Sequence, residues 1–196
     1  VRALRQRDPD LEVFGIGGDA LAGAGTEILH HVNEMAVFGP FAVLQKYPHF
    51  RRVFDEMVNA AATRRPDAAL LVDYGGFNLR FARQLKRLGI KVLYYVSPQV
   101  WASRRGRIRH MAEVADRLMV IFPFEPEVYE GTGLSVDFVG HPLVDAAAAV
   151  RNASPVELPW PGELNVALLP GSRRQEVRRI LPVMLDAATR LHAKHP

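Results

Sequence analysis

One combination of residues that could act in catalysis is a carboxylate followed closely by two glycines. Asp73 follows the apolar run Ala68–Val72, and Gly75 and Gly76 come shortly after it. Glycines allow a ligand to approach the backbone closely, and a carboxylate at such a place can take a proton from an attacking hydroxyl group. The alternative is that Asp73 only caps a helix or forms a turn. The residues alone leave both possibilities for Asp73 open.

A second pattern is typical of an anion-binding turn. Pro170, Gly171, Ser172 and Arg173 stand between the apolar run Leu164–Leu169 and a segment with helical periodicity. A turn of small residues exposes amide hydrogens, a helix N-terminus carries partial positive charge, and arginine is a bidentate donor to phosphate. The spacing is not that of a Walker loop. The alternative is an ordinary capped helix start.

Polar side chains also follow two other apolar runs, Val92–Val96 and Val136–Val139. Ser97, Pro98, Gln99 and Trp101 come after the first run, and His141 comes after the second. Proline ends a strand because it has no amide hydrogen, and ligands of open parallel sheets collect beyond the carboxyl ends of the strands. The alternatives are a helix cap for Ser97, a packing role for Trp101 and a structural hydrogen bond for His141.

The elements that must position these residues alternate between strands and helices. The short runs predict strands, and 92–96 and 68–72 are apolar enough to predict buried strands. Apolar residues at helical spacing predict helices. The glycines that end the first strand indicate a turn, because the G-x-G-x-x-G order is absent. The expected strands are 11–18, 68–72, 92–96, 117–122, 136–139 and 164–169, and the expected helices are 50–63, 77–88, 125–129 and one that follows Arg173. This alternation predicts doubly wound α/β domains.

The domain organisation follows from a proline-rich interval. Asn152–Gly162 contains three prolines and little periodicity, which is typical of a linker. We therefore expect an N-terminal domain over 1–151, a linker over 152–163 and the beginning of a second domain over 164–196. The first residues, Val1–Arg7, have no initiator methionine and are typical of the end of an amphipathic helix. We therefore expect the chain to be part of a longer protein.

Composition narrows the classes of partner without choosing among them. The 196 residues are 48% hydrophobic, contain no cysteine and carry a formal charge of +4; the pI is near 9.7. A phosphorylated ligand, an anionic membrane surface or nucleic acid would suit this charge. The apolar segment Glu34–Tyr47 indicates a partner or a membrane, or else a broken helix packed on its own core. The histidines and carboxylates lack metal-ligand spacing, so we expect no metal site and no cofactor.

Several sequence blocks resemble the lipid-A-disaccharide synthase family, an inverting glycosyltransferase family, and they occur in the family's order. The most specific is YVSPQVWA at 95–102, which matches the family motif Tyr-Val-Ser-Pro-x-Val-Trp-Ala. The other blocks are FGPFAVL at 38–44, LVDYGGFN at 71–78, FPFE at 122–125, VGHPLVD at 139–145 and LLPGSRRQEV at 168–177. The resemblance implies two Rossmann-like domains of the GT-B type. Residues 1–151 would be an acceptor-side domain that is incomplete at its start, and residues 164–196 would begin the donor domain, which binds the nucleotide sugar.

The resemblance also implies roles for particular residues. Asp73 would be the general base, with Asn78 near it; Gly171, Ser172 and Arg173 would face the donor diphosphate. Ser97, Gln99, Trp101 and His141 would border the substrate cleft. The sequence departs from the family at Gly75, where proline is frequent, at Gly76, where some members have a second aspartate, and at Ala42, where glutamate is usual.

The implied reaction is hexosyl transfer without a cofactor. A UDP-2,3-diacylglucosamine donor and a 2,3-diacylglucosamine 1-phosphate acceptor would give lipid A disaccharide 1-phosphate and UDP, in the cytoplasm at the inner face of the bacterial inner membrane. One alternative is another UDP-sugar enzyme of the same fold, an epimerase or a transferase. Another alternative is a non-catalytic basic module that binds nucleic acid. The distribution of basic residues argues against it, because they are dispersed over several helices. We therefore expect no nucleic-acid partner.

Overall fold

The computed structural model describes residues 1–35, 47–99, 106–154 and 165–194. The chain divides into two compact units, Val1–Val150 and Arg151–Pro196, and each is described by itself. Most of the apolar segment Glu34–Tyr47 lies outside the described residues, as do Trp101 and most of the proline-rich interval. How the two units correspond to acceptor and donor domains stays a prediction.

The first unit contains two parallel sheets. The smaller sheet pairs β1 (Phe14–Gly17) with β2 (Glu27–His31). The larger has the order β3-β4-β5-β6. Its strands are β3 (Ala68–Val72), β4 (Lys91–Tyr95), β5 (Arg117–Val120) and β6 (Ser135–Phe138). All pairings are parallel, so the predicted α/β class is confirmed. The strand β2 was not predicted.

Helices connect these strands, as parallel pairing requires. Among the helices that the structure describes in this unit, four are single turns: α1 (Arg2–Arg5), α2 (Asp19–Ala22), α3 (Val32–Met35) and α9 (Glu125–Val128). The longer ones are α5 (Tyr47–Arg64), α6 (Gly75–Arg87), α8 (Arg107–Val114) and α10 (Pro142–Arg151). The predicted helices 50–63, 77–88 and 125–129 are confirmed to within a few residues. Gly89, at φ +74, follows the C-terminal end of α6 as predicted.

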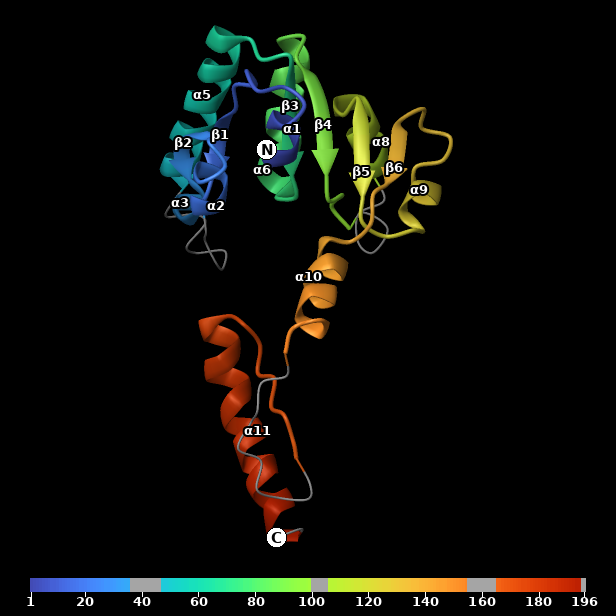
Figure 1. The fold of residues 1–196 in the computed structure, drawn as a ribbon. Coiled ribbons are helices and arrows are strands. Elements are labelled where there is room, and N and C mark those ends of the chain that lie inside the picture. Colours follow the sequence, from blue (N-terminus) through green and yellow to red (C-terminus); the bar gives the residue numbers. More distant parts are fainter. Residues whose placement is uncertain (36–46, 100–105, 155–164, 195–196) are drawn as a thin grey trace. The chain divides into compact units, whose positions relative to one another are not determined.

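The core lies between the larger sheet and its helices. Figure 1 shows α6 and α8 behind the four-stranded sheet. Val92 and Tyr94 of β4 are fully buried, as are Leu85 of α6 and Met111 of α8. The rings of Phe54 in α5 and Phe77 in α6 meet edge to face, with centroids 5.4 Å apart. Residues at helical spacing thus bury one face of each helix against the sheet.

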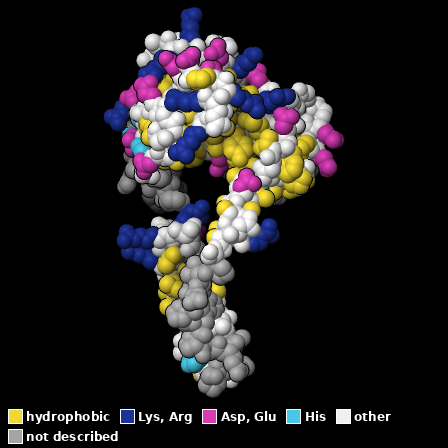
Figure 2. All heavy atoms as spheres, viewed as in Figure 1, with side chains coloured by type: hydrophobic (Ala, Val, Ile, Leu, Met, Phe, Trp, Pro, Cys, Tyr) yellow, Lys and Arg dark blue, Asp and Glu magenta, His cyan; other side chains and the backbone are white. Residues whose placement is uncertain are grey.

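The prediction that two strands would be buried is only half right. On β3, Leu70 is 54% exposed and Val72 is 51% exposed, and Leu93 and Tyr95 of β4 are half-buried. Side chains alternate between the faces of a strand, and α6 and α8 cover one face. Figure 2, which views the opposite face, shows apolar side chains gathered over this sheet. An apolar run therefore predicted the strands correctly but not their burial.

The second unit is dominated by α11 (Arg174–Lys194), the helix predicted to follow Arg173. The strand predicted over 164–169 is wrong, because the described residues 165–169 do not pair with another strand. A strand is stable only when its amides and carbonyls pair with a neighbouring strand, and no other strand lies in the described part of this unit.

Candidate functional site

The candidate residues of the first unit follow strands of one sheet. Asp73 comes after β3, Ser97 and Gln99 come after β4, and His141 comes after β6. Because the four strands are parallel, their carboxyl ends lie along one edge of the sheet. The arrowheads of β4 and β5 point toward this edge in Figure 1. The predicted positions at strand ends are therefore confirmed, whereas the substrate contacts stay predictions.

Asp73 lies in a strained turn that is held by its backbone. Asp73 and Tyr74 have φ of 47° and 44°, a left-handed conformation that costs energy for residues other than glycine. The Tyr94 hydroxyl donates to the Asp73 carbonyl at 2.6 Å, and the Asp73 amide donates to the Tyr95 carbonyl at 2.9 Å. The carboxylate is exposed, so the protein fixes the backbone and leaves the acid group accessible.

Asn78 acts on the same turn from the first turns of α6. Its side-chain amide donates to the Asp73 carbonyl at 2.8 Å and to the Val72 carbonyl at 3.0 Å. These carbonyls lie at the end of β3, where no further strand residue would satisfy them. Asn78 therefore holds the Asp73 turn. This role is structural and is distinct from a direct contact with substrate.

A close approach between two segments explains one of the glycines. A Cβ atom on Gly75 would lie 2.9 Å from Cγ of Pro98, whereas a Cβ atom on Gly76 would meet nothing within 4 Å. Contacts under about 3 Å between carbons are strongly repulsive. Gly75 therefore lets the N-terminus of α6 pack against the proline turn after β4, and Gly76 is not needed for that packing.

The Ser97 hydroxyl is turned into the protein. Ser97 is buried, shares a 2.6 Å hydrogen bond with the Tyr129 hydroxyl and donates to the Pro98 carbonyl at 2.9 Å. Val96, just before it, has φ of 62°. These contacts stabilise the turn after β4. Gln99 is exposed at the same edge.

His141 lies beside an aromatic pair. The rings of Phe122 and Phe124 stack with centroids 5.6 Å apart, and the His141 ring lies 5.6 Å from Phe122. His141 Nδ1 accepts a hydrogen bond from the Leu143 amide at 3.1 Å. Nδ1 of His141 therefore makes a structural hydrogen bond to the first turn of α10, as the alternative interpretation of the sequence predicted.

Sequence reasoning missed three residues that shape this edge. Tyr94 and Tyr129 bond to the Asp73 and Ser97 turns, and Glu125, 1% exposed, accepts from the amides of Ile121 and Phe122. Burial raises the pKa of the Tyr94 hydroxyl, and the Asp73 charge adds to this rise. Burial likewise raises the pKa of Tyr129, so both remain donors at neutral pH. For Tyr94 a signal was available, because it lies within an apolar run and a buried tyrosine hydroxyl needs a partner.

The predicted anion loop of the second unit precedes α11. Gly171 has φ of 102°, which favours glycine. Glu176 caps the helix: Arg173 Nη1 donates to Glu176 Oε1 at 2.5 Å, and the Arg173 amide donates to Oε2 at 3.2 Å. The Arg173 hydrogen bond lowers the pKa of Glu176. A carboxylate of the chain itself therefore occupies the position proposed for phosphate.

Within the described ranges no group of histidines and carboxylates has the geometry to hold a metal ion. Among the described helices, none is long and apolar enough to cross a membrane.

Comparison with known proteins places this chain. The model of the lipid-A-disaccharide synthetase family matches residues 1–196. The chain belongs to this family. A lipid-A-disaccharide synthase of Myxococcus xanthus is 46% identical over 202 residues, covering 100% of this chain and 52% of that protein. The lipid-A-disaccharide synthase of Syntrophotalea carbinolica is 45% identical, and the match covers 51% of that protein. The one of Geobacter sulfurreducens is 41% identical, and the match covers 52% of that protein. The chain thus spans about half the length of these relatives.

Proposed function

We propose that this chain is part of a glycosyltransferase of lipid A biosynthesis, comprising most of the acceptor-side domain and the beginning of the domain that binds the nucleotide sugar. The enzyme would join UDP-2,3-diacylglucosamine to 2,3-diacylglucosamine 1-phosphate with inversion and release UDP. Family membership along all 196 residues supports this reaction. The transfer reaction would take place at the inner face of the bacterial inner membrane, where a peripheral protein could reach both acylated substrates.

The observation that carries the proposal is the Asp73 turn. Inverting transfer needs a base that removes the proton of the acceptor hydroxyl while its oxygen attacks the anomeric carbon. Asp73 offers an exposed carboxylate on a backbone fixed by Tyr94 and Asn78, and a fixed position reduces the entropy lost in reaching the transition state. Asp73 is the proposed general base.

The leaving UDP needs positive charge and amide donors in place of a metal. Arg173 and the amides at the N-terminus of α11 are the proposed groups. Gly171 and Ser172 form the turn that exposes those amides. The diphosphate would replace the Glu176 carboxylate, which now accepts from Arg173.

The reaction is tested with a full-length synthase that carries this sequence. Purified enzyme is given both acylated sugars, and UDP and the disaccharide are measured together. We expect equimolar UDP and disaccharide only when both substrates are present. UDP release from a non-acylated UDP-sugar, epimerised donor without disaccharide, or binding of generic RNA in place of UDP would each contradict the proposed function.

A further inference from the structure

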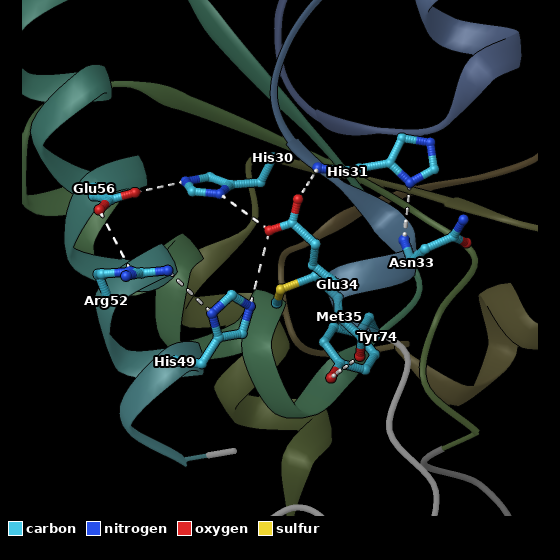
Figure 3. A network of polar contacts seen from close by, with 9 residues as sticks. All are labelled: His30, His31, Asn33, Glu34, Met35, His49, Arg52, Glu56 and Tyr74. Atoms are coloured by element: carbon cyan, nitrogen blue, oxygen red, sulfur yellow. Dashed lines mark hydrogen bonds and ion pairs between the residues drawn. The ribbon is translucent and has the colours of Figure 1, made fainter.

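A polar network links three elements on the β2 side of the first unit. Figure 3 shows His30 of β2 between Glu34 of α3 and Glu56 of α5. His30 Nε2 lies 2.8 Å from Glu56 Oε2, and Nδ1 lies 3.7 Å from Glu34 Oε2. The His30 side chain is only 14% exposed. One ring thus joins two helices that start from different parts of the chain.

Other contacts surround this bridge. His49 Nε2 lies 3.9 Å from Glu34 Oε2, and Arg52 lies near both His49 Nδ1, at 3.4 Å, and Glu56 Oε1, at 3.8 Å. The contacts of Glu34 therefore come from β2 and from α5. Because these side chains are partly exposed, their contribution to the overall stability of the protein is small. The contacts of His30 and His49 meet at Glu34, so we infer that they hold α3 in position.

The residue after Glu34 connects the network to the candidate site. Met35 is buried in the core at the end of α3, and its carbonyl accepts a long hydrogen bond, 3.4 Å, from the Tyr74 hydroxyl. Tyr74 is the left-handed neighbour of Asp73. A path of contacts thus runs from Glu56 through His30, Glu34 and Met35 to Tyr74, and all of these side chains lie in one close-up (Figure 3).

We propose that His30 is a positioning residue for the Asp73 site: by joining α3 to α5, it holds Met35 against Tyr74 and fixes the turn that carries the Asp73 carboxylate. The inference rests on the proposed role of Asp73 as the base. The Asp73 carbonyl is held by Asn78 of α6 and Tyr94 of β4, whereas Tyr74 is held by the Met35 carbonyl of α3. His30 acts through the second of these contacts.

The test uses matched carboxylate variants of α5 in a full-length synthase that carries this sequence. Glu56→Gln removes the charge that faces His30, whereas Asp55→Asn removes a neighbouring charge that faces Arg51. We expect Glu56→Gln and His30→Gln to lower kcat about two- to thirtyfold with an unchanged KM for the donor. Asp55→Asn should leave both parameters unchanged.

A double variant separates positioning from a general structural effect. If His30 acts through Tyr74, then adding His30→Gln to Tyr74→Phe should lower kcat little further, because the path is already broken. Effects that multiply would overturn the inference, as would His30→Gln and Glu56→Gln variants that behave like Asp55→Asn. If His30→Gln does not fold, Glu56→Gln combined with Tyr74→Phe decides by the same criterion.

Hydrogen exchange gives a readout that does not depend on activity. Amides of residues 74–78 should exchange faster in His30→Gln than in Asp55→Asn, and equal rates would contradict the inference. Asp73→Asn, measured alongside, tests the base itself: retained turnover there would overturn the proposed role of Asp73 and, with it, the inference about His30. An inactive Asp73→Asn with normal His30 variants would overturn only the role of His30.

Discussion

Arg173 already has an anionic partner, the Glu176 carboxylate, and any phosphate at the α11 N-terminus must displace it. The two side chains are 2.5 Å apart at their closest, and both are partly exposed, so the pair itself adds little stability. A diphosphate carries more charge and more acceptor oxygens than a carboxylate does. If UDP binds here as proposed, the exchange would favour it, although by less than binding to an arginine with no carboxylate partner would.

The first prediction concerns this arginine. Arg173→Ala in a full-length synthase should weaken UDP binding by at most about 1.5 to 3 kcal/mol, because a charge-assisted hydrogen bond is lost. The melting temperature should change little. Arg174→Ala, which removes an exposed neighbouring charge, is the control and should bind normally. Calorimetric titration with UDP measures both, and equal affinities for the two variants would remove Arg173 from the site.

For individual residues, the sequence indicated which side chains are candidates for the site but not what they contact. Asp73 and Arg173 were predicted from their positions after apolar runs and from the family motif. The partners of Asp73 and Ser97 were not predicted, because Tyr94 and Tyr129 lie 21 and 32 residues away along the chain. Such pairings depend on how the elements pack, and spacing in sequence contains little of that information.

At the level of elements, the N-terminus of α6 shows how tightly the site is packed. Gly75 has the ring of Pro98 at 2.9 Å from where a Cβ would be, and the Tyr94 hydroxyl is 4.0 Å from it. A proline ring has little freedom to move away. Any side chain on Gly75 must therefore displace the turn after β4 or tilt α6 away from Asp73.

The second prediction compares the two adjacent glycines. Gly75→Ala should destabilise the protein by about 1 to 3 kcal/mol, as overpacking does, and it should also reduce turnover. Gly76→Ala should be neutral or stabilise by up to about 1 kcal/mol, since alanine favours a helix and its methyl group meets no atom. Denaturant unfolding of both variants in a full-length synthase measures the difference. Equal stabilities would show that the close approach is not a constraint.

The elements themselves were largely predictable where local signals agree. Proline after β4 and glycine after α6 define ends that depend on the backbone alone. By contrast β2, with two histidines among its five residues, has no apolar run to mark it. The predicted strand 164–169 has an apolar pattern but no neighbouring strand in the described part of its unit. Pairing is therefore the information that the local pattern lacks.

For the molecule as a whole, the division of the first unit into two sheets has an energetic consequence. In the described residues β1 pairs only with β2, and β3 pairs only with β4 among the other strands. The outer edge of β3 thus leaves backbone groups without a strand partner, beside the exposed Leu70 and Val72. Open edges and exposed apolar surface favour association and reduce the gain from folding.

The third prediction is that the 196-residue chain alone is marginally stable and inactive. It should melt broadly, bind a dye that reports exposed apolar surface, and associate at micromolar concentration, because its sheet edges and apolar face are open. Calorimetry with dye binding and an activity assay check this. A sharp, reversible transition accompanied by glycosyl transfer would contradict the argument from the two sheets.

The proposed role of Asp73 is to remove the proton of the acceptor hydroxyl, and a single substitution can separate this role from a structural one. Asn at this position keeps the size and the turn-forming hydrogen bonds but cannot accept the proton. In a full-length synthase we predict that Asp73→Asn lowers kcat about a hundred- to ten-thousandfold, with the melting temperature and UDP affinity nearly unchanged. Near-normal turnover combined with a lowered melting temperature would instead show that Asp73 is structural and is not the base.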